Sequence, residues 1–285
     1  MNAVISAQGL TKRYGKATAI DNVSFDIHKG CIMGLIGPNG SGKTTTLKAI
    51  LGLVPFDGEL SVLGLDPRTQ RNELMKQVTF IADVAVLPRW IQVRKVVEFV
   101  AGVHPSFDRQ KAERYIAATK LKPSMKVNEM SKGMVVQLHL ALIMSINAKV
   151  LVLDEPTLGL DIIYRRQFYR SLLEDYFDQD KTIIVSTHQI EEIENVITDL
   201  MFMKDGRIFL RESMDSLAER FTEIRVSQDQ IDTAIALRPI DTRNVLGQTT
   251  MLFDGVPRDQ LQCLGEVRVP QLADLFVTTL HGAAA

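Results

Sequence analysis

The sequence predicts an α/β fold in which a mostly parallel sheet has an antiparallel edge. Short apolar segments typical of buried strands alternate with segments whose apolar residues recur at helical spacing. This alternation favours parallel strands joined by helices. Asp205-Gly206, between the apolar segments 200–203 and 207–210, predicts a tight hairpin at one edge of the sheet. The 285 residues, 46% hydrophobic and 24% charged, suffice for one large or two modest domains.

The elements can be assigned in chain order. We expect strands at 4–7, 23–27, 31–36, 78–82, 149–153, 182–186, 200–203 and 207–210, and a hairpin-like stretch at 55–64. Helices are expected at 45–51, 93–103, 108–121, 131–147, 162–177 and 189–197. The sequence thus predicts a core at 1–83 and 148–210 with a helical subdomain, 84–147, inserted between strands. Residues 211–285 change character and predict a small α+β extension that ends in a helix after Pro270.

The segment Gly37-Pro38-Asn39-Gly40-Ser41-Gly42-Lys43-Thr44 fits the phosphate-loop pattern G-x-x-x-x-G-K-[ST]. It lies between a predicted buried strand and a predicted helix, which begins at Thr45. Glycines let backbone N–H groups turn inward around phosphate oxygens, and the helix N-terminus adds favourable dipoles. Lys43 can reach the β- and γ-phosphates, and the Thr44 hydroxyl can ligate Mg²⁺. The motif predicts a P-loop NTPase fold with a site for phosphate oxygens and magnesium.

A second motif follows the buried strand 150–153, which ends in the adjacent carboxylates Asp154 and Glu155. Successive side chains of a strand point in different directions, so the two carboxylates can take different tasks. Asp154 is predicted to bind Mg²⁺ beside Thr44, and Glu155 to polarise an attacking water. Phosphoryl transfer needs mainly such positioning and charge neutralisation. An ordinary acidic loop at the strand end is the alternative.

With both motifs present, residues 1–210 resemble the ATP-binding subunits of ABC transporters, in the single-domain export type. The resemblance implies that Tyr14 stacks on adenine, since an aromatic face tolerates any base. It also implies that His188, at the end of Ser186-Thr187-His188, contacts the γ-phosphate. The catalytic residues implied are therefore Glu155, His188 and Lys43.

Met130-Ser131-Lys132-Gly133-Met134 occupies the place of the family's Leu-Ser-Gly-Gly-Gln signature. The resemblance implies that Ser131 and Gly133 bind the ATP held by the opposite subunit's phosphate loop. Ser131 is also a good N-cap for the helix that follows. Lys132 and Met134 depart from the pattern. Lys132 either adds positive charge near phosphate or points to solvent.

Asp83 is another departure, because the family usually has Gln at the end of this strand. Mg²⁺ favours oxygen ligands and keeps several waters, so Asp83 could reach the metal through water. Alternatively, Asp83 only starts a loop and a nearby polar group performs this task.

The resemblance implies two partners: a second copy, arranged head to tail, and a separate transmembrane permease subunit. It places the protein in the cytoplasm, on the inner face of the cell membrane. The formal net charge of −1 argues against a nucleic-acid partner. Two alternatives remain open, a soluble ABC-type ATPase without a transport role and an ATP-binding regulatory module with weak hydrolysis.

Overall fold

A six-stranded sheet forms the centre of the protein, whose computed structural model describes residues 3–81, 87–245 and 247–282. Its strand order is β5-β6-β7-β3-β8-β9. All neighbours are parallel except β8 and β9, which form the hairpin predicted at Asp205-Gly206. The strands are β3 Ile32–Ile36, β5 Val78–Ile81, β6 Val150–Asp154, β7 Thr182–Thr187, β8 Asp199–Lys204 and β9 Arg207–Ser213. The predicted α/β fold with an antiparallel edge is confirmed.

The carboxyl ends of the central strands bring the predicted site residues together. Every residue of β3, β6 and β7 is buried, which explains why these strands are mostly apolar. The register pairs Asp154 with Ser186, and Ile36 with Thr187. The segments that follow these three strands therefore emerge side by side.

A separate antiparallel sheet, order β2-β1-β4, consists of β1 Ala3–Tyr14, β2 Ala17–His28 and β4 Asp57–Val62. The strands expected at 4–7 and 23–27 are parts of this long hairpin. The hairpin-like stretch expected at 55–64 is mainly one strand, 57–62, that pairs with β1. A tight turn follows it, in which Val62 and Leu65 exchange backbone hydrogen bonds. A Cβ at Gly58 would lie 2.4 Å from the carbonyl oxygen of Gly9, so this glycine permits the close approach of β4 to β1.

Helices cover the main sheet and build the insertion. The core carries α1 Lys43–Ile50, α2 Arg71–Leu74, α6 Ile162–Ser171 and α7 Ile190–Ile193. The insertion contains α3 Val93–Val103, α4 Arg109–Ala117 and α5 Lys132–Ile143, which share a hydrophobic cluster of their own. Four helices are shorter than expected. Helix α4 ends at Ala117 rather than 121, and α5 ends at Ile143 rather than 147. Helix α6 ends at Ser171 before a π-helical turn at Leu172–Tyr176, and α7 ends at Ile193 rather than 197. No helix within the described residues is long and apolar enough to cross a membrane.

The extension forms a four-stranded antiparallel sheet of order β11-β12-β10-β13. Its β-α-β-β-α-β sequence is the split arrangement found in ferredoxin-like folds. The elements are α8 Met214–Arg220, β10 Phe221–Val226, α9 Ile231–Ala236, β11 Asp241–Val245, β12 Gln248–Asp254, α10 Arg258–Gln262, β13 Gly265–Arg268 and α11 Leu272–Gly282. Short 3-10 turns lie at Val127–Glu129 and Gln228–Gln230.

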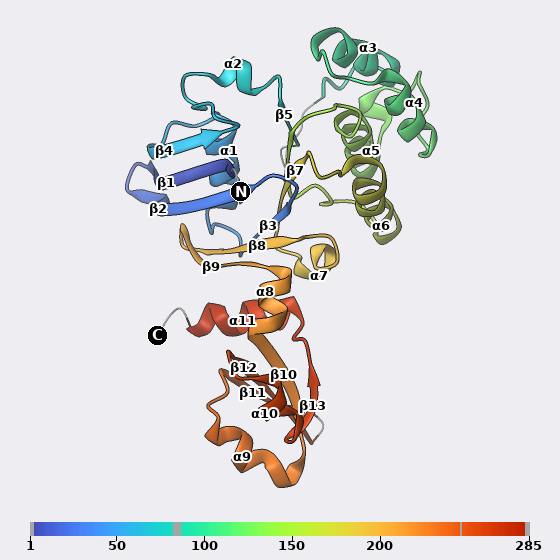
Figure 1. The fold of residues 1–285 in the computed structure, drawn as a ribbon. Helices are drawn as coiled ribbons and strands as arrows, with labels where there is room; N and C mark the ends of the chain where they lie inside the picture. The colour runs from blue at the N-terminus through green and yellow to red at the C-terminus, as the bar shows by residue number, and fades with distance from the viewer. Residues whose placement is uncertain (1–2, 82–86, 246, 283–285) are drawn as a thin grey trace.

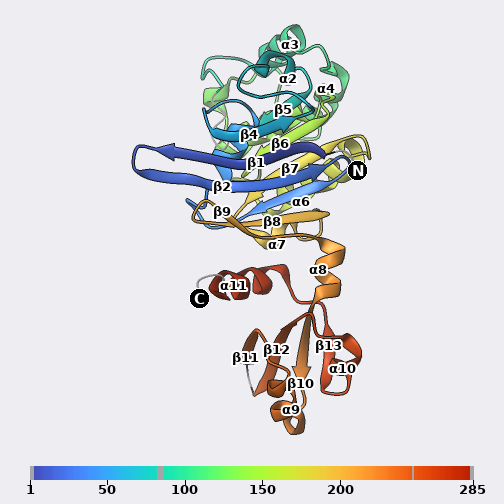
Figure 2. The ribbon, with the colours of Figure 1, turned by 60° about the vertical axis from the view of Figure 1, so that its left-hand side comes forward.

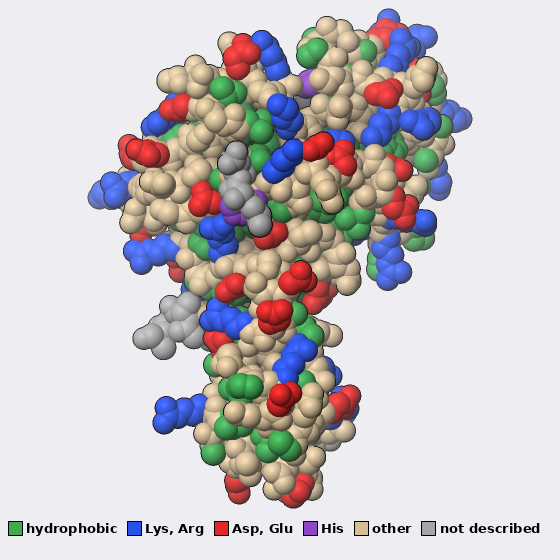
Figure 3. All heavy atoms as spheres, in the orientation of Figure 1, with side chains coloured by type: hydrophobic (Ala, Val, Ile, Leu, Met, Phe, Trp, Pro, Cys, Tyr) green, Lys and Arg blue, Asp and Glu red, His purple; other side chains and the backbone are tan. Residues whose placement is uncertain are grey.

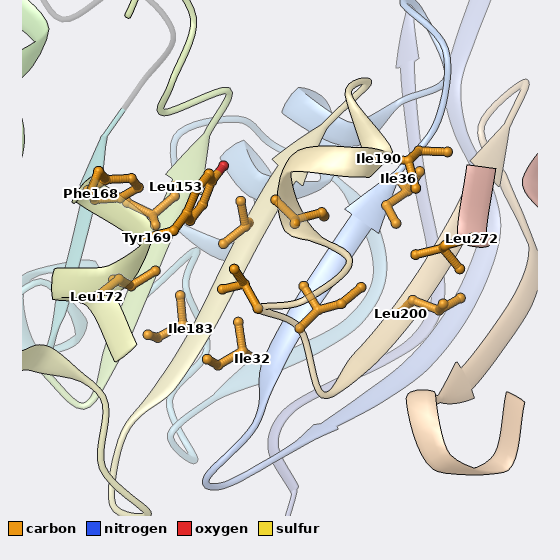
Figure 4. Packing of buried hydrophobic residues seen from close by; sticks show 14 of the residues in the cluster. Ile32, Ile36, Leu153, Phe168, Tyr169, Leu172, Ile183, Ile190, Leu200 and Leu272 are labelled. Atoms are coloured by element: carbon orange, nitrogen blue, oxygen red, sulfur yellow. The ribbon is translucent and has the colours of Figure 1, made fainter. Parts of the chain in front are cut away.

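Helix α11 returns from the extension to the core, as two views of the ribbon show (Figures 1 and 2). Leu272 belongs to the same buried cluster as Leu200 of β8 and Ile190 of α7 (Figure 4). Leu275 is a member of this cluster as well. That cluster also includes Leu252 of the extension sheet. One hydrophobic core therefore joins the two parts. Side chains of both charges are interspersed over the face shown in Figure 3.

Candidate active site

The phosphate-loop segment, residues 37–44, connects β3 to α1 through backbone that only glycine allows at two positions. A Cβ at Gly37 would lie 2.3 Å from the Met203 carbonyl oxygen, and one at Gly42, whose φ is 106°, would lie 2.4 Å from the Ala19 oxygen. Gly206 N–H donates to the Ser41 carbonyl at 3.0 Å and braces the loop.

Two features of this loop fit an anionic ligand. The Ser41 hydroxyl is buried and has no hydrogen-bond partner among the described residues. At the start of α1, no described side chain caps the helix. Buried donors without partners are costly, and the positive end of a helix favours negative charge. The loop is therefore suited to phosphate oxygens.

Lys43 lies buried between this loop and the carboxylates of β6. Its Nζ donates to the carbonyl oxygens of Gly37 at 2.7 Å and Pro38 at 3.2 Å, and lies 4.0 Å from Oε1 of Glu155. Burial lowers the pKa of Lys43, while Glu155 and Asp154 act in the opposite direction. The ammonium group thus sits where the loop meets the end of β6.

Asp154 and Glu155 diverge at the end of β6. Asp154 Oδ1 accepts from Thr44 Oγ1 at 3.1 Å and from Ser186 Oγ at 2.5 Å. Glu155 has a left-handed backbone, φ 47°, and its N–H donates to Ser186 Oγ at 3.2 Å. Its carboxylate contacts Thr187 and His188 instead of Thr44. This separation matches the two tasks predicted for the carboxylates.

The pair of Thr44 and Asp154 offers oxygen ligands of the kind that Mg²⁺ prefers. Within the described residues, no group of three or more His, Cys, Asp or Glu side chains could hold a metal. A magnesium ion beside Asp154 would therefore complete its shell with substrate oxygens and water, as Mg²⁺ commonly does. Asp83, also predicted to act through the metal, lies outside the described residues.

His188 directly follows β7, and its side chain contacts Glu155. Its Nδ1 lies 2.9 Å from Oε1 of Glu155, and Thr187 Oγ1 donates to the other oxygen, Oε2, at 3.4 Å. Glu155, Lys43 and His188 therefore converge at one edge of the sheet. Ser186 has no site role predicted from the sequence, although it directly precedes Thr187 and His188 at the strand end.

Tyr14 lies near the phosphate loop through the β1–β2 hairpin. It pairs with Ala17, two residues before Ala19, whose carbonyl closely approaches Gly42. Its side chain is 49% exposed, and Lys12 Nζ lies 4.9 Å from the ring centroid. An aromatic face is therefore available to a ligand beside the loop.

The signature residues lie elsewhere in the same chain. Ser131 caps α5, since its Oγ accepts from Met134 N–H at 3.2 Å, and the side chains of Ser131 and Lys132 are exposed. A Cβ at Gly133 would lie 3.3 Å from the carbonyl oxygen of Gly159. Ser131, Lys132 and Gly133 line a hollow of about 500 Å³ to which none of residues 37–44 contributes. The structure does not bring Ser131 and Gly133 to the chain's own phosphate loop.

Comparisons with known proteins place the chain in a family. The family model described as "ABC transporter" matches residues 20–158. The Nod factor export ATP-binding protein I of Burkholderia orbicola is 34% identical over 211 residues, which cover 72% of this chain and 69% of that protein. The chain belongs to the ABC transporter family.

Two further comparisons bear on the extent of this family likeness. The probable multidrug ABC transporter ATP-binding protein YbhF of Escherichia coli is 34% identical over 197 residues, or 67% of this chain, but the match spans only 34% of YbhF. A dimeric bacterial ABC transporter cassette, MJ0796, has the same fold, with a TM-score of 0.64 at 24% identity, over 74% of this chain and 98% of that one.

Proposed function

We propose that the chain binds and hydrolyses ATP in a magnesium-dependent reaction and drives a separate membrane-spanning permease. The observation that carries this proposal is the convergence of Lys43, Glu155 and His188 at the carboxyl ends of the parallel strands. Relatives that are named export or multidrug ATP-binding proteins support the transport role.

In this proposal, residues 37–45 cradle the phosphates and Tyr14 stacks on the base. Lys43 exchanges its two bonds to the loop carbonyls for phosphate oxygens. Thr44 and Asp154 would hold Mg²⁺, with Asp83 acting through water, and the metal would neutralise phosphate charge. These contacts position the γ-phosphate rather than perform covalent chemistry.

Glu155 and His188 would act on the attacking water. The Glu155 side chain is 15% exposed, so a water molecule could reach it although its neighbours hold it in place. It would orient the water and accept its proton. The His188 ring, 2.9 Å from Glu155, would fix that carboxylate and contact the γ-phosphate.

A second copy would complete the site. Ser131 and Gly133 lie apart from the chain's own phosphate loop, and Ser131 is exposed at the N-terminus of α5, where anions are favoured. A head-to-tail dimer would place these residues over the partner's ATP. Hydrolysis would then remove the γ-phosphate link between the copies. The permease would hold the dimer at the cytoplasmic face of the membrane.

Turnover of ATP by wild type and Glu155→Gln tests this proposal. We expect the substitution to lower turnover by about 10²–10⁴-fold, the usual effect of losing a general base. It should leave an ATP-bound dimer that light scattering can detect. Glu219→Gln, the same change at an exposed glutamate of α8, serves as control and should match wild type. Equal turnover of Glu155→Gln and the control would exclude Glu155 as the base.

A further inference from the structure

Arg165 of α6 joins three segments near the place where Glu155 and His188 meet. Its Nε donates to the Leu160 carbonyl at 2.8 Å, and its Nη1 donates to Oε1 of Gln189 at 2.8 Å and to Oε1 of Glu192. Leu160 belongs to the loop that follows Glu155, whereas Gln189 directly follows His188. One guanidinium group therefore ties the segment after β6 to the segment after β7.

Glu192 of α7 makes a second link between these segments. Its Oε2 accepts from the hydroxyl of Thr157 at 2.8 Å, two residues beyond Glu155. Thr157 is buried, and the side chains of Arg165 and Glu192 are 27% and 17% exposed. Partly buried, charge-assisted hydrogen bonds of this kind are stronger than surface ion pairs. We name the pair of Arg165 and Glu192 the α6–α7 bridge.

The position of His188 depends on what holds α7. This helix has only four residues, from Ile190 to Ile193, so its own backbone bonds supply little rigidity. His188 is two residues before the helix, and its side chain is 35% exposed. The bridge fixes the polar face of α7, while buried Ile190 and Ile193 fix the other face.

We propose that Arg165 and Glu192 are positioning residues for ATP hydrolysis: the α6–α7 bridge holds His188 in contact with Glu155. The inference rests on the proposed function, because it assigns a task within the same site. Neither residue contacts the phosphate loop through a hydrogen bond or ion pair in the described part of the chain. Their effect therefore falls on the rate of hydrolysis rather than on ATP affinity.

Glu192→Gln keeps the size of the side chain and removes its charge. We expect kcat to fall roughly 10- to 100-fold, since a displacement of about 1 Å at a catalytic group costs this much. The dissociation constant for ATP, measured by calorimetry, should stay within about twofold of wild type. Glu191→Gln is the matched control, because Glu191 is the adjacent, exposed glutamate of the same helix. A kcat of Glu192→Gln equal to that of this control would overturn the proposal.

A double-mutant cycle separates positioning from general destabilisation. If Glu192 acts through His188, Glu192→Gln should lower single-turnover rates in wild type but change them less than about twofold in a His188→Ala background. Arg165→Lys keeps the charge but loses the planar fork, so it should resemble Glu192→Gln. Equal rate losses in both backgrounds would show that the bridge acts independently of His188.

Histidine NMR tests the bridge without any requirement for hydrolysis. The ring signal of His188, assigned by its absence in His188→Ala, should shift on Glu155→Gln in the otherwise wild-type protein. In a Glu192→Gln background, adding Glu155→Gln should move the His188 signal much less. A displacement of equal size in both backgrounds would refute the proposed role of the α6–α7 bridge. Absence of hydrolysis in wild type would instead refute the proposed function, and the two failures are thereby distinguishable.

Discussion

Ser186→Ala removes a hydroxyl group that contacts the carboxylate of Asp154 and the backbone N–H of Glu155. In the structure, Ser186 Oγ donates to Asp154 Oδ1 at 2.5 Å and accepts from the Glu155 N–H at 3.2 Å. The alanine loses both bonds in a fully buried position. The fold should tolerate the change, because the Glu155 N–H also donates to the Ser186 carbonyl, which remains.

The expected effect falls on the use of magnesium. If the Thr44 hydroxyl turned toward a bound metal, Ser186 would still donate to Asp154 and orient it. A hydrogen bond to a charged group contributes about 1.5–3 kcal/mol, which corresponds to roughly a 10- to 150-fold change in an equilibrium or rate constant. We therefore expect kcat/KM for ATP to fall by this factor and the half-saturating Mg²⁺ concentration to rise.

The assay is steady-state ATP hydrolysis at a series of Mg²⁺ concentrations. Ser145→Ala provides the control, because Ser145 is equally buried and its hydroxyl donates to the Ala141 carbonyl at 2.6 Å, just after the end of α5. Both variants lose one buried hydroxyl, but only Ser186 contacts Asp154. Identical Mg²⁺ dependence in the two variants would refute a supporting role for Ser186.

Two predictions concern stability. Leu275 of α11 is fully buried, so Leu275→Ala should lower the free energy of unfolding, measured by urea titration, by about 2–5 kcal/mol. Val277 is 50% exposed on the same helix, so Val277→Ala should change this free energy little. Equal unfolding midpoints of the two variants would contradict the packing argument. Burial lowers the pKa of His104 and of His139 from 6.5, so the unfolded chain binds more protons than the folded one between the lowered pKa and 6.5. The free energy of unfolding should therefore fall as pH drops through this window, and His139→Gln should reduce the slope; a slope equal to that of wild type would exclude His139 as a contributor.

Local chemistry explains what the sequence could predict. Apolar strands, the glycine-rich loop and the two carboxylates each lie within a few residues of one another. Caps are local as well: the Asp161 side chain accepts from the N–H groups of Ile163 and Tyr164, as its place before α6 suggests. The α/β class and the place of the candidate site at the strand ends followed from these signals.

Long-range pairing explains what the sequence did not show. Strand β4 pairs with β1 about fifty residues away, and no local pattern marks the close approach of Gly58 to Gly9 of β1. The extension combines four short strands whose order depends on tertiary packing. Within the site, Ser186 meets Asp154 across 32 positions, and no local pattern marks that contact.

Helix α7 shows why the extension cannot be treated as an independent appendage. On one side, Arg165 and Thr157 hold its Glu192 against the segment that follows Glu155. On the other side, Leu272 N–H of α11 donates to Oε1 of Glu194 at 2.9 Å, and Leu272 packs into the cluster that contains Ile193. The short helix after His188 is thus fixed jointly by the core and by the extension's last helix. A change in the docking of α11 would consequently reach α7 directly, without first altering the central sheet.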